Sequence, residues 1–113
     1  MIKFVYTIDY PVGQKRAYME WVRTIADILQ GPDEIKRLAS YDNYFSASPH
    51  RVVEFEFATM EDAAHYFERK DVSRVLQGDL PNHSSNIQIT VLKRLGDYTK
   101  ATSTEGYEPY EGQ

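Results

Sequence analysis

The chain of 113 residues contains no cysteine, a single tryptophan and no long apolar run. The absence of cysteine excludes disulfide frameworks, cysteine-ligated zinc, thiol nucleophiles and iron–sulfur clusters held by cysteine. No uninterrupted apolar run exceeds three residues, whereas a membrane span needs about 20. Residues 1–8 also lack the apolar centre of a signal peptide. The sequence therefore predicts a cytoplasmic protein that does not enter a membrane.

The net charge of −4 is unevenly distributed along the chain. Residues 97–113 hold four acidic residues and one basic residue, while residues 1–96 hold 13 acidic and 12 basic residues. We therefore expect one nearly neutral domain over 1–96 and an acidic, tyrosine-bearing extension over 97–113. A solvated tail is the simpler expectation. Its three tyrosines, Tyr98, Tyr107 and Tyr110, leave docking on a neighbouring subunit open, because aromatic residues are depleted in disordered segments.

Alternation of apolar and polar residues predicts four strands, and a longer period predicts two main helices. Strands are expected at 2–9, 34–45, 51–58 and 86–95, and helices at 14–30 and 60–67. Gly31-Pro32 is expected to end the first helix, with the glycine in a left-handed cap. Residues 71–80 are predicted to form a short helix or irregular connection that ends near Gly78 and Pro81. The order β-α-β-β-α-β predicts an α+β, ferredoxin-like sandwich: a four-stranded antiparallel sheet with both helices on one face.

The second helix is expected to begin at a capping Thr59, with Asp62 three residues later. Its buried stripe is predicted to comprise Met60, Ala63, Ala64 and Phe67.

The two faces of the predicted sheet differ in composition. The richer apolar face, expected beneath the helices, carries Phe4, Tyr6, Ile8, Val53, Phe55, Phe57, Ile87, Ile89 and Val91. On the opposite face, Glu54 and Glu56 would repel phosphate, and with the negative net charge they argue against nucleic acid as a partner. Val5, Val52 and Leu92 on that face favour contact with a second copy of the chain, with Lys3 or Arg94 neutralising the glutamates. The alternative is a face that simply meets water.

Several features of the sequence resemble those of a known group of proteins. The order of elements, the segment Glu20-Trp21-Val22, the strand over 51–57 and the helix opening over 59–64 are similar to the dimeric α/β-barrel superfamily. That superfamily includes antibiotic-biosynthesis monooxygenases, EthD-like, REDY-like and stress-responsive barrel proteins. The resemblance covers residues 1–96 and implies a homodimer whose two sheets pack face to face into a barrel. It also implies a pocket between each sheet and its own helices.

Aromatic residues gather where such a pocket would lie. We predict Tyr6, Trp21 and Phe57 as ligand-binding residues around this space, with Tyr18 and Tyr66 nearby. Such a group favours a planar or aromatic ligand. Ordinary core packing is the alternative for each of them.

His83 and Tyr66 are the candidate catalytic residues. His83 lies in the loop 80–85 before the last strand, and the resemblance to cyclase-type relatives implies acid–base work by a histidine with tyrosines. A neutral imidazole can remove an acidic carbon-bound proton near pH 7. An ordinary polar loop histidine is the alternative.

The other two histidines are expected to be exposed. His65 shares a polar helical stripe with Glu61 and Glu68, which argues against the haem ligation that helix histidines perform in haem-degrading relatives. His50 lies in a predicted hairpin. We therefore expect no cofactor and no metal.

Two functions follow as hypotheses. The first is small-molecule binding or cofactor-independent tailoring, monooxygenase-like or cyclase-like, of a small hydrophobic or aromatic metabolite. The second is a non-catalytic homodimeric interaction protein, and the sequence leaves open whether the chain is an enzyme.

Overall fold

The computed structural model describes residues 1–98. The elements in chain order are β1 (Ile2–Asp9), α1 (Lys15–Gln30), β2 (Ile35–Asp42), β3 (Arg51–Phe57), α2 (Met60–Glu68), α3 (Lys70–Ser73), the π-helical turn η1 (Arg74–Asp79), α4 (Leu80–His83) and β4 (Ser85–Lys93). Most of the predicted acidic extension, including Tyr107 and Tyr110, lies outside the described residues.

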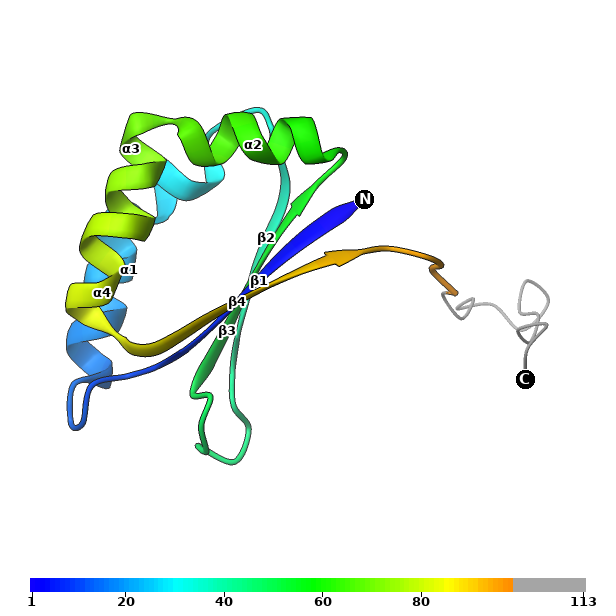
Figure 1. Ribbon diagram of the computed structural model, residues 1–113. Helices are drawn as coiled ribbons and strands as arrows, with labels where there is room; N and C mark the ends of the chain where they lie inside the picture. Colours follow the sequence, from blue (N-terminus) through cyan, green and yellow to red (C-terminus); the bar gives the residue numbers. More distant parts are fainter. Residues whose placement is uncertain (99–113) are drawn as a thin grey trace, which may run out of the picture.

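The four strands form one antiparallel sheet in the order β2-β3-β1-β4. Tyr6 in the central strand β1 lies opposite Val53 of β3 and Ile89 of β4. The helices all lie on one side of this sheet (Figure 1). The predicted ferredoxin-like α+β fold is confirmed. Among the described helices, none is both long and apolar enough to cross a membrane.

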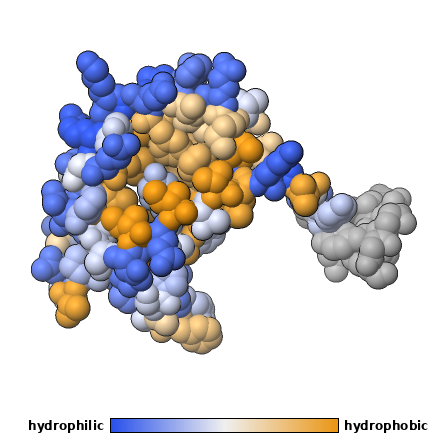
Figure 2. Space-filling view, in the orientation of Figure 1, coloured by the Kyte–Doolittle hydropathy of each residue, from blue (hydrophilic) through white to orange (hydrophobic). Residues whose placement is uncertain are grey.

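The core forms where the helices cover the richer apolar face of the sheet. Ile8, Phe55 and Phe57 are almost completely buried, as the alternation in β1 and β3 predicts. Helix α1 contributes Tyr18, Ile25 and Leu29, whose spacing places them along one helical stripe. In Figure 2 polar residues cover the outside of the helices, and apolar residues gather between the helices and the sheet.

The buried stripe of α2 differs from the predicted one. Ala63 and Tyr66 are fully buried, whereas Ala64 is exposed and Met60 is half exposed. Phe67 is partly buried and packs against the core, as predicted, so the stripe consists of Ala63, Tyr66 and Phe67. The predicted cap is present, because the Thr59 side chain accepts a hydrogen bond from the Asp62 amide at 3.1 Å.

Helix α1 ends at Gly31, as predicted, but two details of the helix ends differ from the expectations. The segment after α2 does not end near Gly78 and Pro81 but stays helical through His83. Pro81 falls in the first turn of α4, where a missing N–H does little harm, and the wider π-helical turn precedes it. Gly31 ends α1 with a right-handed φ of −75° rather than a left-handed cap. A Cβ there would lie 2.8 Å from the carbonyl oxygen of Asp27, so close approach explains the glycine.

The face of the sheet opposite the helices carries a network of charges. Lys3 contacts Glu54 at 3.0 Å and Glu56 at 3.5 Å, as the sequence pattern predicts. Arg37 and Arg94 also approach Glu56, at 3.5 Å and 3.9 Å. The Glu56 side chain is only 5% exposed, and its Oε2 accepts no hydrogen bond. These charges are thus partly neutralised within one chain.

Candidate binding site

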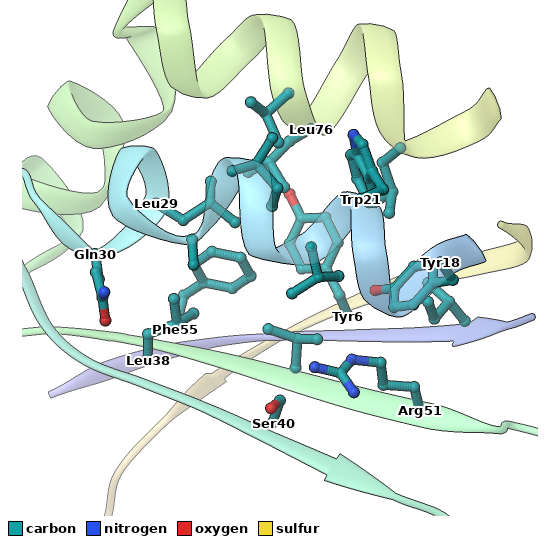
Figure 3. Close-up of a pocket in the computed structure, with 17 residues that line it drawn as sticks. Tyr6, Tyr18, Trp21, Leu29, Gln30, Leu38, Ser40, Arg51, Phe55 and Leu76 are labelled. Atoms are coloured by element: carbon teal, nitrogen blue, oxygen red, sulfur yellow. The ribbon is translucent and has the colours of Figure 1, made fainter. Parts of the chain in front are cut away.

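A cavity of about 230 Å³ lies between the sheet and helix α1, closed on its far side by η1 and the start of α4. Figure 3 shows its lining residues, which come from β1, α1, β2, β3, η1 and α4. The lining is mostly aromatic and aliphatic: Tyr6, Ile8, Tyr18, Trp21, Val22, Ile25, Ala26, Leu29, Gln30, Leu38, Ser40, Arg51, Val53, Phe55, Val75, Leu76 and Leu80.

Tyr6, Tyr18 and Trp21 supply the aromatic part of this lining. Tyr6 projects from the sheet toward the helices (Figure 3), and burial raises the pKa of its phenol to about 12. Burial likewise raises the pKa of Tyr18 to about 12. The rings of Tyr18 and Trp21 meet edge to face, with centroids 5.7 Å apart. Both tyrosines therefore stay neutral near pH 7 and offer flat, weakly polar surfaces to a ligand.

Arg51 is a cavity residue that the sequence reasoning missed. It is the first residue of β3 and lies opposite Ile8, so its side chain shares the helix-covered face with Val53 and Phe55. The side chain is only 8% exposed, and its guanidinium lies 5.5 Å from the ring centroid of Tyr18. The sequence did contain a sign of this role, because Arg51 falls among the alternating positions of the strand that are otherwise apolar.

Asp42 is the acidic partner of Arg51, and it also binds Tyr10 and Lys15. Its Oδ1 lies 3.5 Å from Nη1 of Arg51 and accepts a hydrogen bond from the Tyr10 hydroxyl at 2.5 Å. Its Oδ2 accepts from Lys15 at 3.0 Å. The hydrogen bonds from Tyr10 and Lys15 hold the pKa of Asp42 below its usual value, so the carboxylate is ionised near pH 7. Asp42 also borders a second, more polar hollow of about 530 Å³ at the end of the sheet.

His83 lies directly behind one wall of the cavity. Its imidazole stacks on the indole of Trp21, with ring centroids 4.3 Å apart and planes 12° from parallel. His83 is half buried and is not among the residues that line the cavity. The structure therefore brings His83 to Trp21, and only through Trp21 to the cavity.

Tyr66 and Phe57 lie in the packed core, and neither is among the lining residues. Both are fully buried, and their rings contact each other with centroids 5.1 Å apart. The Tyr66 hydroxyl donates a hydrogen bond to the backbone carbonyl of Leu29, and burial raises the pKa of this phenol. Of the five residues predicted for the site, Tyr6 and Trp21 line the cavity, while Phe57, Tyr66 and His83 lie around it.

The remaining histidines lie away from the cavity. His65 is exposed on α2, as expected. His50 is half buried rather than exposed, because its Nδ1 accepts a hydrogen bond from the Tyr10 amide and its ring stacks on that of Tyr10. Within residues 1–98, no group of three or more histidine, aspartate and glutamate side chains is placed to hold a metal ion.

No family model matches the chain, and neither does any curated protein. Solved structures do match. A DABB-family protein with a ferredoxin-like fold from Mesorhizobium loti aligns with a TM-score of 0.71 at 12% identity, covering 84% of this chain and 97% of that one. HapK from Hahella chejuensis aligns with a TM-score of 0.70 at 15% identity, covering 89% and 99%. A provisionally assigned antibiotic biosynthesis monooxygenase from Deinococcus radiodurans aligns with a TM-score of 0.72 at 12% identity, covering 91% and 100%.

The chain shares the fold of these proteins. Its structural neighbours include a DABB-family protein and antibiotic biosynthesis monooxygenases. At such low identities the alignments establish the fold alone.

Proposed function

We propose that the chain binds a small hydrophobic, aromatic metabolite in the cavity between its sheet and helices. The observation that carries this proposal is the cavity of about 230 Å³ with Tyr6, Tyr18 and Trp21 in its lining. Close-packed domains leave few voids larger than a water molecule. A cavity of about 150 Å³ with an apolar lining is enough to hold benzene. This one is therefore suited to a somewhat larger ring system.

The fold supports a tailoring role for the same cavity. One structural neighbour is provisionally assigned to the antibiotic biosynthesis monooxygenases, which is consistent with chemistry on a small metabolite. The catalytic form of the proposal assigns cofactor-independent, monooxygenase-like or cyclase-like acid–base chemistry to His83 and Tyr66. The geometry supports binding more directly, because Trp21 separates His83 from the cavity and the Tyr66 hydroxyl is engaged with Leu29.

Binding is tested by native mass spectrometry of freshly purified protein, followed by titration with the neutral probe 1-naphthalenemethanol. Trp21 is the only tryptophan and lines the cavity, so its emission should respond to binding. Ala26→Phe places a ring into the lining and should abolish the response. The matched change Ala64→Phe, on the exposed side of α2, should leave it intact. Equal responses from both variants would refute binding in this cavity.

We further propose that two copies pair through the sheet face opposite the helices. This face carries half-buried Val5 and Val52 and exposed Tyr41 and Leu92 around the Glu56 charge network. An apolar surface mixed with charges fits an interface between copies better than it fits a solvated face. The same face would carry the alternative function, a non-catalytic interaction protein.

The pairing is tested by sedimentation equilibrium at micromolar concentration. Leu92→Glu is expected to give monomers. Ile89→Glu is the matched control, because Ile89 lies on the same strand with similar exposure, 53% against 48%, but on the helix side. A wild-type chain that sediments as a monomer would overturn the pairing.

A further inference from the structure

We propose that Arg51 makes the cavity selective for an anionic ligand, an aromatic carboxylate whose charged group binds the guanidinium while its ring packs among the aromatic residues. This inference rests on the proposed function and deepens it by naming the chemical class of the ligand.

The burial of Arg51 is the first support. Its side chain is 8% exposed, and its Nε is buried without a hydrogen-bond partner among residues 1–98. Buried polar groups in native proteins almost always have a partner, so an orphaned donor needs an explanation. Because Arg51 belongs to the cavity lining, its guanidinium can meet a ligand, through its Nη groups rather than through the covered Nε. Figure 3 shows the guanidinium at the level of the strands, below Tyr18.

The charge of Arg51 is also incompletely neutralised. Within residues 1–98 its ion-pair partner is Asp42, which lies 3.5 Å away, beyond ordinary hydrogen-bond length. The same carboxylate binds Lys15 at 3.0 Å and accepts a hydrogen bond from the Tyr10 hydroxyl. The guanidinium also contacts Met19 Sδ at 3.6 Å, a weak acceptor, and the side chains of Tyr10 and Tyr18. Because Asp42 is shared by Lys15 and Arg51, one carboxylate faces two cations, and positive charge remains for another anion.

Arg51 is the one charged residue among those that line the cavity. The other polar residues of the lining, including Gln30 and Ser40, are neutral. A single cation in a mainly apolar cavity attracts an anion and repels other cations. The planar guanidinium matches a carboxylate through two parallel N–H···O bonds, which a neutral alcohol cannot reproduce.

A purely structural role for Arg51 is the competing explanation. Its contact with the Tyr18 ring and its ion pair with Asp42 would then be its whole purpose. That explanation accounts for the packing of the side chain but not for a cation in the lining of an otherwise uncharged cavity.

Isothermal titration calorimetry at pH 7 tests the proposal with two probes of similar size, 1-naphthoate and 1-naphthalenemethanol. The wild type is expected to bind the carboxylate roughly tenfold or more tightly than the alcohol. Arg51→Met should abolish this preference while keeping the affinity for the alcohol, which also shows that the cavity is still folded. Arg37→Met, which removes an exposed arginine from the opposite face of the sheet, should leave the preference unchanged.

The outcomes separate the two proposals. If the wild type binds both probes equally, the cavity binds ligands, but the proposal that it selects anions is wrong. If Arg51→Met keeps the preference for the carboxylate, Arg51 is not its source and the proposal fails. If neither probe binds the wild type, the proposed function fails and this inference fails with it.

Discussion

Tyr66→Phe is expected to destabilise the fold although it removes only one oxygen atom. Leu29 lies in the last turn of α1, where the final carbonyls of a helix lack intrahelical partners. The Tyr66 hydroxyl from α2 donates to the Leu29 carbonyl. This bond therefore completes the end of one helix with a side chain from another.

The expected loss follows from the burial of both groups. Tyr66 is fully buried and Leu29 is 7% exposed, so water does not readily replace the hydroxyl. A buried acceptor left without its partner costs about 1–3 kcal/mol. For a domain of this size each kcal/mol corresponds to about 4–8 °C in melting temperature. The aromatic ring is kept in the variant, so no cavity contributes to the change.

Urea unfolding followed by Trp21 emission measures the effect at a fixed protein concentration. The midpoint should fall while the slope with denaturant stays constant. Tyr44→Phe is the matched control, because Tyr44 is 91% exposed and its hydroxyl meets solvent. If Tyr66→Phe is as stable as Tyr44→Phe, the hydroxyl does not complete the helix end and the reasoning is refuted.

Three further predictions concern other contacts. Thr59→Ala should lower the unfolding free energy by about 1 kcal/mol, measured by urea unfolding, because it removes the cap of α2; an unchanged midpoint would contradict this. The Ser48 hydroxyl and other donors hold the pKa of Asp9 below its usual value. The stability from Asp9 is therefore present above the unfolded-state pKa of about 3.9 and is lost as the pH falls through the lower folded-state value. Asp9→Asn should flatten this acid dependence of the urea midpoint, and an equally steep profile would count against it. His83→Ala should shift Trp21 emission to longer wavelength, since it uncovers one face of the indole; an unshifted spectrum would mean that the stack does not persist in solution.

Sequence patterns predicted the fold well because the sheet is covered on one side only. In β1 and β3 every second residue meets the helices, and Tyr6, Phe55 and Phe57 lie there as expected. Glycine and proline residues were less informative about where helices begin and end. Proline often marks a helix boundary, but Pro81 lies in the first turn of α4, where a proline is tolerated.

The site was harder to predict than the fold. Whether a buried aromatic residue lines a cavity or fills the core depends on small displacements between elements distant in sequence. Tyr6 and Trp21 line the cavity. Phe57 lies on the same face of the sheet as Tyr6 but packs against Tyr66 instead. The proposed role of Arg51 depends on its face of the strand, which the alternation contains, and on its place in the cavity lining, which depends on the packing of distant elements.

The position of β4 has a consequence for how the protein behaves at high concentration. It is a nine-residue strand at the edge of the sheet, and it exposes Ile89 and Val91 on one face and Leu92 on the other. A long edge strand with apolar side chains is a template for pairing with other chains. Charged substitutions of the exposed apolar residues along this edge should therefore reduce aggregation at high concentration.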